Sequence, residues 1–375
     1  MATPIRTVHL ISAASDGGAD ILVKDLVIAS RRAGQEPLVL FASRAADLGL
    51  SVETEGAFLE ELRREGVPYR FLRRGCRRNL PLGAMQVRRA CREHRAQIYH
   101  SHLKIGILFG ALLKIPRVHT HHSSIAKMPH WAYRMLNPLV EAHVSVSDAC
   151  AESIRRFTGR PVVSIRSGVR PERIPAARRR PHRPSGEISC LAVGRLRPAK
   201  NYPLLVEAIA RLSPEVRRKL RVSIAGEASP AAAAELISHI RSAGLGDVIT
   251  LLGGRDDIPQ LLGDADLFLM SSAWEGLPIA LLEATMSGLP FIATDVGGCA
   301  EAAAVARNGI VVDPADADAF AAAVAALVSD REKLSNLSAN ALANRDAFNI
   351  EATVEGHNRL YRSLIGDLPA DRAAS

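Results

Sequence analysis

The sequence predicts an α/β protein built from two Rossmann-like, doubly wound parallel-sheet domains that face each other across a cleft. Three observations predict this fold. The chain has 375 residues, about the size of two ordinary domains. Short apolar segments alternate with amphipathic segments of helical spacing, which is typical of parallel sheets with crossover helices. This alternation occurs twice, on either side of a linker rich in proline and arginine at residues 171–187.

The first domain, expected over residues 1–180, opens with an apolar strand at residues 7–12. A loop containing Gly17 and Gly18 follows, and an amphipathic helix then runs to a glycine stop at Gly34. The same periodicity predicts helices near residues 84–94 and 105–113, and further strands at residues 37–42, 96–102, 117–123 and 142–147.

The second domain is expected over residues 188–345 and repeats this pattern. Strands are predicted at residues 188–196, 221–227, 248–254, 266–272, 290–298 and 309–313, with helices at 203–213, 233–244 and 278–288. Residues 346–375 are expected to form a last amphipathic helix that returns to the first domain, followed by a polar tail. Ligands of open α/β sheets bind at the carboxyl ends of the strands, so we expect the active site in the cleft.

Cysteine usage and apolar stretches indicate the compartment. The five cysteines are scattered without the paired spacing of a zinc site or a disulfide framework, which favours a reducing cytoplasm. The longest apolar stretches fall short of the ~20 residues that span a bilayer, and the first residues do not resemble a secretory signal. We therefore expect a cytoplasmic protein, peripheral on the inner face of the cytoplasmic membrane.

Positive charge is concentrated in one stretch of the first domain. Between Arg63 and Arg95 there are 11 arginines and only two acidic residues. Charge runs are often merely solvated surface, but this one suits an anionic membrane surface or a lipid-linked diphosphate. Nucleic acid is not an expected partner, because aromatic residues make up only 4% of the chain.

Two glutamates flank a turn and the start of a helix in the second domain. Glu275 precedes the turn, and Glu283 lies on the helix behind it. The first turn of a helix carries unpaired N–H groups and partial positive charge, which bind phosphate. A diphosphate there would leave Glu275 near an attached sugar and Glu283 near a ribose. The turn and helix start consist of Gly276, Leu277, Pro278 and Ile279.

Two cations follow the first strand of the second domain. Gly194 ends that strand, Arg195 comes next, and Lys200 stands five residues later. Both side chains are placed to reach a leaving diphosphate, where preorganised positive charge is the main catalytic contribution. The pattern predicts a phosphate clamp.

With these motifs the chain resembles the retaining glycosyltransferases of family 4, also called glycosyltransferase group 1, which have the two-domain GT-B fold. The resemblance covers nearly the full length and rests on EGLPIALLEA at residues 275–284 and GGCAE at 297–301. It implies that Glu275 contacts donor-sugar hydroxyls and that Glu283 binds the ribose. It also implies phosphate contacts from Arg195 and Lys200, and donor contacts from Gly17, Gly18, Arg255 and the backbone of residues 276–279.

Five histidines cluster at the ends of two successive predicted strands: His100, His102, His119, His121 and His122. A zinc site would use three or four of them, but no acidic residue lies nearby in sequence to orient the rings, so no metal is expected. The resemblance implies that His122 lies against the donor sugar near its C6 hydroxyl. We expect the other four to be packing or acceptor-side residues.

Together with these observations, the resemblance implies a retaining hexosyl- or N-acetylhexosaminyltransferase that is expected to need neither cofactor nor metal. Its donor is a nucleotide sugar, with a UDP-sugar favoured and GDP-mannose as the alternative. The expected acceptor is a saccharide or lipid-linked molecule in cell-surface polysaccharide or lipopolysaccharide synthesis. The expected catalytic residues are Glu275, His122, Arg195 and Lys200.

Three other classes of protein fit less well. An epimerase would need its own acid and base, and a nicotinamide oxidoreductase would carry G-x-G-x-x-G after a strand, which neither glycine loop supplies. A non-catalytic protein that binds a nucleotide sugar or anionic lipid would be expected to have lost one of the four charged residues Glu275, Glu283, Arg195 and Lys200.

Overall fold

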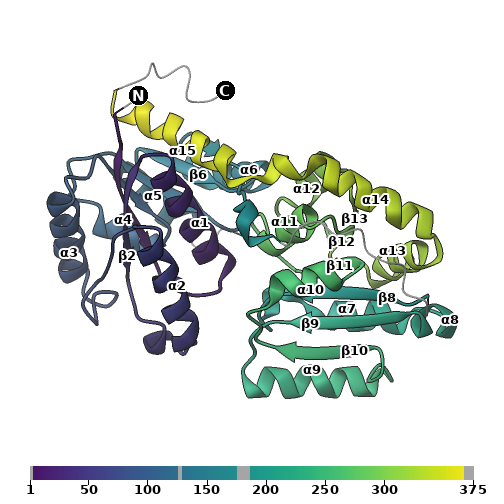
Figure 1. The fold of residues 1–375 in the computed structure, drawn as a ribbon. Helices are drawn as coiled ribbons and strands as arrows, with labels where there is room; N and C mark the ends of the chain where they lie inside the picture. Colours follow the sequence, from purple (N-terminus) through teal and green to yellow (C-terminus); the bar gives the residue numbers. More distant parts are fainter. Residues whose placement is uncertain (1–2, 126–128, 175–185, 367–375) are drawn as a thin grey trace. The chain divides into compact units, whose positions relative to one another are not determined.

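The computed structural model describes residues 3–125, 129–174 and 186–366. The chain divides into two compact units, which are described separately below. Met1–Arg170 and Ile350–Ser375 form the first unit, and Pro171–Asn349 form the second. Each unit is built on its own parallel sheet (Figure 1), which confirms the predicted fold class. Most of the predicted linker, residues 175–185, and the tail at 367–375 lie outside the described residues.

The first unit contains a parallel sheet of seven strands in the order β3-β2-β1-β4-β5-β6-β7. The inner strands are almost wholly buried, as expected for a sheet covered by helices on both faces. The strand order reverses between β1 and β4, where ligands of such sheets bind. The strands are β1 (Arg6–Ile11), β2 (Glu36–Phe41), β3 (Tyr69–Phe71), β4 (Ile98–Ser101), β5 (Arg117–His121), β6 (Ala142–Ser145) and β7 (Val162–Ser164).

Crossover helices connect these strands and cover the sheet. Gly17 is the N-cap of α1, and Gly18 is its first residue, so the helix begins earlier than the predicted loop allowed. Several elements were not predicted, among them β3, whose three residues are too few to show a period. The helices are α1 (Gly18–Arg32), α2 (Val52–Arg64), α3 (Leu80–Glu93), α4 (Lys104–Phe109), α5 (His130–Leu136), α6 (Asp148–Thr158) and α15 (Ile350–Leu364).

The last helix, α15, belongs to the first unit and packs against α1 (Figure 1). Its buried residues recur at helical spacing, and Leu360 and Tyr361 join the core formed by Ile5, just before β1, and the strand residues Ile98 and Val118. This apolar stripe explains why a segment 250 residues after β4 in sequence folds back onto the same sheet.

The second unit contains six parallel strands in the order β10-β9-β8-β11-β12-β13. Here the order reverses between β8 and β11. The strands are β8 (Ile188–Val193), β9 (Leu220–Ala225), β10 (Ile249–Gly253), β11 (Leu267–Met270), β12 (Phe291–Thr294) and β13 (Gly309–Val312).

The helices of the second unit complete its core. Residues of α7, α9 and α13 pack with strand residues such as Cys190, Val222 and Leu269. The helices are α7 (Tyr202–Ala210), α8 (Pro214–Arg218), α9 (Pro230–Ser242), α10 (Ile258–Asp264), α11 (Ile279–Met286), α12 (Cys299–Ala306), α13 (Ala317–Ser329) and α14 (Arg331–Asn344). Single 3-10 turns occur at Ala46–Leu48, Asn137–Leu139, Pro171–Arg173, Pro198–Lys200 and Arg345–Phe348.

Candidate active site

The loops that follow β8 and β11 are held together at the strand-order reversal of the second unit. The two strands are neighbours in the sheet, so their carboxyl ends lie side by side. The backbone N–H of Ala273 donates to the carbonyl of Ala199 at 2.8 Å, and the Ser271 hydroxyl donates to the carbonyl of Lys200 at 2.9 Å. These bonds fix the predicted phosphate-binding loop against the glutamate turn.

Lys200 and Glu275 meet where these two loops join. Lys200 Nζ lies 2.7 Å from Glu275 Oε1, and the Ser272 hydroxyl donates to the same oxygen at 2.8 Å. The side chains are only 21% and 16% exposed, so the ion pair is partly shielded from water. Two residues that were predicted separately, for the phosphates and for the sugar, thus form one charged pair in the protein.

The turn between Glu275 and α11 is braced by the loop after β12. Gly297 has a positive φ of 56°, and a side chain at this position would collide with the carbonyl of Gly276. The N–H of Gly298 donates to that same carbonyl at 2.6 Å. The GG of the second sequence motif therefore supports the glutamate turn, and α11 begins directly behind it at Ile279, after Pro278 as N-cap.

Glu283 lies on α11 and is 8% exposed. Arg173 Nη2 donates to its Oε1 at 2.5 Å. Arg173 was not singled out in the sequence, because it stands in the proline-rich segment that was interpreted as a linker. It orients the carboxylate that was predicted to bind the ribose.

The remaining predicted donor residues lie on separate loops of the two units. Gly194 follows β8, and its carbonyl accepts from the Tyr202 hydroxyl at 2.7 Å. Arg195 comes next and is half-buried. Arg255 follows β10, is exposed and pairs with Asp257 at 2.5 Å. In the first unit, the N–H of Gly17 donates to the Ser15 hydroxyl at 3.2 Å, which fixes the turn before α1.

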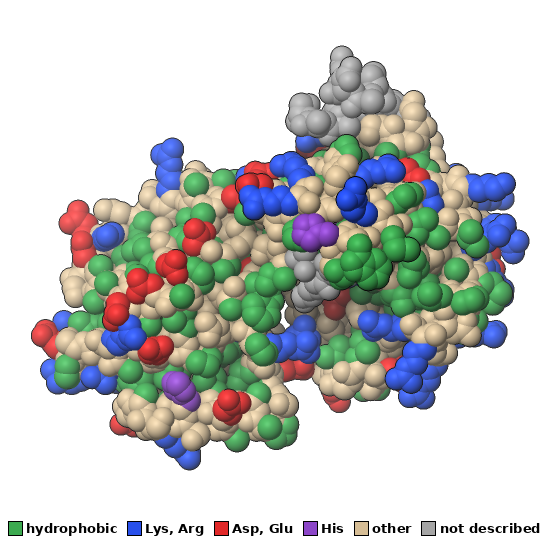
Figure 2. Space-filling view, turned by 180° about the vertical axis from the view of Figure 1, so that it is seen from behind, with side chains coloured by type: hydrophobic (Ala, Val, Ile, Leu, Met, Phe, Trp, Pro, Cys, Tyr) green, Lys and Arg blue, Asp and Glu red, His purple; other side chains and the backbone are tan. Residues whose placement is uncertain are grey.

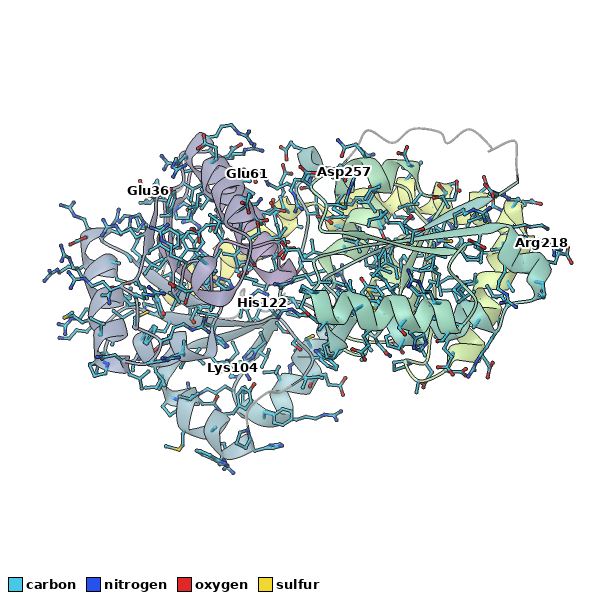
Figure 3. All side chains as sticks on the ribbon, turned by 90° about the horizontal axis from the view of Figure 1, so that it is seen from below. Glu36, Glu61, Lys104, His122, Arg218 and Asp257 are labelled. Atoms are coloured by element: carbon cyan, nitrogen blue, oxygen red, sulfur yellow. The ribbon has the colours of Figure 1, made fainter. Side chains whose placement is uncertain are left out.

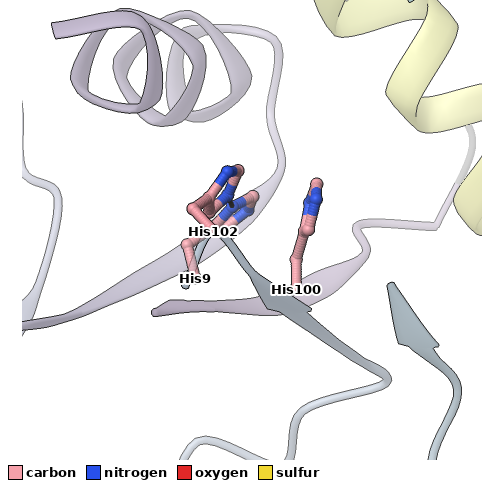
Figure 4. A group of neighbouring side chains, drawn as sticks. All are labelled: His9, His100 and His102. Atoms are coloured by element: carbon pink, nitrogen blue, oxygen red, sulfur yellow. Dashed lines mark hydrogen bonds between the residues drawn. The ribbon is translucent and has the colours of Figure 1, made fainter. Parts of the chain in front are cut away.

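Histidines gather at the strand-order reversal of the first unit, and His122 lies in the loop that follows β5 (Figure 3). His102 Nδ1 lies 3.0 Å from His122 Nε2. His9 was not predicted, because a single histidine within an apolar strand carries no signal by itself; its Nδ1 lies 3.2 Å from His102 Nε2 (Figure 4).

Three of these histidines are spaced closely enough to hold a metal ion. His9, His100 and His102 each offer a ring nitrogen, and these atoms lie within 4.8 Å of one another. Each ring nitrogen of the three already has a hydrogen-bond partner in the protein; for His100 the partners are the hydroxyls of Tyr361 and Thr120, both at 2.6 Å. The hydrogen-bonding capacity of the three imidazole rings is therefore filled within the protein.

Desolvation keeps eight histidines of the first unit uncharged. Desolvation lowers the pKa of His9 and of His119 to about 3, and that of His122 and of His143 to about 4. The same cause lowers the pKa of His357 to about 4, and it holds those of His100, His102 and His121 well below 6.5. At neutral pH these rings are neutral hydrogen-bonding groups.

Two doubly wound parallel-sheet domains, the second with an ion pair and a helix N-terminus at its strand-order reversal, define a GT-B protein. A family model described as Glycosyltransferase Family 4 matches residues 16–173, and one described as Glycosyl transferases group 1 matches residues 174–343. The chain therefore belongs to the group 1 glycosyltransferases, as the sequence motifs predicted.

Two curated relatives and one solved structure illustrate the similarity. The lipopolysaccharide core biosynthesis mannosyltransferase LpsB of Rhizobium meliloti is 34% identical over 178 residues, which cover 46% of this chain and 50% of LpsB. The D-inositol 3-phosphate glycosyltransferase of Thermobispora bispora is 28% identical, and its alignment covers 93% of this chain and 90% of that protein. The structure of Anabaena HepE in complex with UDP-glucose aligns with a TM-score of 0.78 at 19% identity, covering 97% of this chain and all of HepE.

The neutral histidines predict acid sensitivity of the fold. Unfolding exposes imidazoles of ordinary pKa near 6.5, so below this pH the unfolded chain binds protons that the folded chain does not. Stability should fall as the pH drops from about 6.5 toward 4, by up to about 1.4 kcal/mol per pH unit for each such histidine. Melting temperatures between pH 7.5 and 5 measure this loss.

A matched pair of variants attributes the effect to burial. His143→Gln removes one buried ring and should flatten the pH dependence, whereas His239→Gln changes an exposed histidine of α9 and should leave it as it is. Equal slopes in all three proteins would contradict the histidine explanation.

Proposed function

We propose that the protein is a retaining glycosyltransferase that moves a hexosyl or N-acetylhexosaminyl group from a nucleotide sugar, with a UDP-sugar favoured, to an acceptor hydroxyl. The observation that carries this proposal is the shielded Lys200–Glu275 pair between the β8 and β11 loops, beside the start of α11. A cation and a helix N-terminus suit a diphosphate, and a carboxylate suits sugar hydroxyls. The likeness to HepE, solved with UDP-glucose, supports a UDP-sugar donor.

In the proposed reaction the bond between the sugar C1 and the diphosphate oxygen breaks while C1 bonds to the acceptor oxygen. The acceptor approaches from the face that the diphosphate leaves and passes its proton to a departing phosphate oxygen, so no protein base is needed. Lys200, Arg195 and the N-terminus of α11 stabilise the charge on the leaving group. Glu275 and His122 hold the sugar, and Glu283, oriented by Arg173, holds the ribose.

No cofactor or metal takes part in this proposal. The phosphate charge is met by Lys200, Arg195 and the helix dipole. The cluster of His9, His100 and His102 in the first unit uses its ring nitrogens in hydrogen bonds within the protein. Added EDTA is therefore expected to leave turnover unchanged.

A GDP-mannose-dependent mannosyltransferase is the second candidate. The relative LpsB is named as a lipopolysaccharide core mannosyltransferase and is the more similar of the two curated relatives in percentage identity. Either donor leads to the same proposed acceptor class, a saccharide or lipid-linked molecule of cell-surface polysaccharide or lipopolysaccharide synthesis. A protein that binds a nucleotide sugar or anionic lipid without transferring sugar would keep the binding and lack turnover.

The donor is identified by thermal shift with UDP, GDP, ADP and their common sugar conjugates. UDP and a UDP-sugar are expected to raise the melting temperature, because a ligand that binds only the folded state stabilises it by mass action. A shift with GDP and GDP-mannose alone would select the mannosyltransferase. No shift with any of them would contradict a nucleotide-sugar donor.

The shielded ion pair predicts non-additive effects of Lys200→Ala and Glu275→Ala. Lys200→Ala should weaken UDP by about 10- to 100-fold in calorimetry, the worth of a charge-assisted hydrogen bond, and leave uridine binding nearly unchanged. Glu275→Ala should abolish most turnover and change UDP affinity less. Because each variant also deprives the other residue of its partner, the double variant should lose less than the sum of the two.

Glu207→Ala is the control for this cycle, since Glu207 on α7 forms an exposed pair with Arg211, the C-cap of that helix. Normal turnover in Glu275→Ala would refute the sugar contact. Equal losses of UDP and uridine in Lys200→Ala would refute the phosphate contact.

The basic stretch of the first unit supports a peripheral membrane association. All 11 arginines between Arg63 and Arg95 are exposed. On the face of this unit drawn in Figure 2, Lys and Arg side chains cover more of the surface than Asp and Glu side chains do. On α3, Met85 is 60% exposed and shares the outer helix face with Arg88 and Arg92, neither of which has an ion pair within the described residues. Basic side chains around an exposed apolar one are typical of helices that lie on anionic bilayers. Within the described part of the chain, no helix is both long and apolar enough to cross a membrane.

Liposome sedimentation tests this association. The protein should bind phosphatidylglycerol vesicles at low salt and dissociate from them at high salt, and it should not bind phosphatidylcholine vesicles. Replacing both Arg88 and Arg92 with Glu should lower the partition coefficient at least tenfold, since each Arg near the surface is worth about 1 kcal/mol. Arg218→Glu, an exposed change on α8 (Figure 3), should not. Absence of binding at low salt would remove the membrane from the proposal.

A further inference from the structure

A chain of hydrogen bonds runs from the interior of the first sheet to His122. Thr7 Oγ1 lies 3.1 Å from His9 Nε2, and His9 Nδ1 lies 3.2 Å from His102 Nε2 (Figure 4). His102 Nδ1 then lies 3.0 Å from His122 Nε2. The four side chains come from β1, from the end of β4 and from the end of β5, so three parallel strands contribute to one chain, here named the imidazole relay.

The rings of the relay are neutral, as their burial requires. A neutral imidazole carries one N–H donor and one unprotonated nitrogen. Two such rings form a hydrogen bond only when a protonated nitrogen of one faces an unprotonated nitrogen of the other. The tautomer of each ring in the relay therefore determines the tautomer of the next.

Only two arrangements satisfy every contact in the relay. In the first, the Thr7 hydroxyl donates to His9 Nε2, His9 Nδ1–H donates to His102 Nε2, and His102 Nδ1–H donates to His122 Nε2. In the second, every bond runs in the opposite direction. Any mixed arrangement brings two N–H groups or two lone pairs together, which is unfavourable for buried groups.

The hydrogen bond of the Thr7 hydroxyl determines which of the two arrangements is more stable. Its side chain is buried at 4% exposure, and within the described residues His9 Nε2 is the only partner of its hydroxyl. The first arrangement uses the hydroxyl hydrogen, whereas the second leaves that hydrogen buried without an acceptor. Burying an unpaired polar hydrogen is unfavourable, so the first arrangement is the stable one.

The outer end of the relay then carries a donor. In the first arrangement His122 accepts at Nε2 and bears its proton on Nδ1. The ring is half-buried, and its Nδ1 has no hydrogen-bond partner within the described residues. A neutral N–H at this place suits an oxygen of an uncharged hydroxyl, such as that of a sugar.

His100 does not compete with this relay, although its ring centroid lies 4.2 Å from that of His102. Its two nitrogens are hydrogen-bonded to the hydroxyls of Tyr361 and Thr120 instead. Among the described residues, the His102 nitrogens bond only to His9 and His122.

We propose that Thr7, His9 and His102 are positioning residues that hold His122 in its Nδ1–H tautomer, so that it donates a hydrogen bond to a hydroxyl oxygen of the sugar. The identity of the hydroxyl rests on the proposed function; the tautomer does not. The buried threonine at the far end of the relay sets the hydrogen-bonding character of a ring that it does not touch.

Nitrogen NMR of the protein labelled with 15N-histidine tests the relay without any substrate. Protonated and unprotonated ring nitrogens have well-separated shifts, and the rings are assigned by single His→Gln variants. His9, His102 and His122 should all show a protonated Nδ1 and an unprotonated Nε2. Thr7→Val, which keeps the shape and removes the hydroxyl, should shift the His122 Nδ1 signal toward the unprotonated value, and Thr7→Ser should restore it.

Two results would overturn the relay. One is a His122 ring protonated on Nε2 in the unaltered protein, and the other is a His122 signal that does not respond to Thr7→Val while the His9 signal does. Thermal melts of both Thr7 variants identify general misfolding, which would move the signals of all rings together. If Thr7→Val does not fold, His102→Phe interrupts the relay nearer its outer end and should change His122 alike.

A measurement of turnover distinguishes a failure of the relay from a failure of the proposed function. If His122 donates to the sugar, Thr7→Val should lower kcat about 2- to 10-fold, the worth of one hydrogen bond, with little change in the affinity for free nucleotide diphosphate. If the tautomer shifts in the NMR spectrum and kcat stays constant, the relay stands and the sugar contact of His122 is wrong.

Discussion

The constraint on which both units depend is that a buried parallel sheet exposes its strands only at their ends. Each strand is covered by crossover helices, so polar side chains that serve a ligand must stand where the strands stop. The order of strands reverses once in each sheet, between β1 and β4 and between β8 and β11, and there the loops diverge. The imidazole relay lies at the first reversal, and the Lys200–Glu275 pair lies at the second.

Much of this arrangement followed from the sequence because it has a local signal. The alternation of apolar strands and amphipathic helices predicted both sheets, and the spacing from Glu275 to Glu283 placed one carboxylate before α11 and the other on it. The GG of the GGCAE motif was also singled out in the sequence, and the structure supplies the reason: Gly297 adopts a positive φ against the glutamate turn.

What the sequence did not show depends on contacts between distant segments. Nothing in the residues around Arg173 indicates that it reaches Glu283, 110 positions away. His9 stands within an apolar strand, and only the pairing of β1 with β4 brings it to His102. The Lys200–Glu275 pair was likewise not predicted, because each residue alone suits a ligand and nothing in the sequence indicates that the two form an ion pair with each other. Short elements such as β3 lack enough residues to show a period.

The two reversals differ in their electrostatics, and the difference follows from burial. Lys200 and Glu275 keep about a fifth of their side-chain surface in solvent and form an ion pair, whose cation suits contact with a phosphate. The three histidines of the relay have no acidic partner in their hydrogen bonds, and desolvation leaves them neutral. A neutral ring cannot attract a diphosphate, but it can distinguish the donor from the acceptor side of a hydroxyl once its tautomer is fixed. A ring in equilibrium between two tautomers would hold a hydroxyl less firmly, which gives a physical reason to tie His122 to a buried hydroxyl through two further imidazoles.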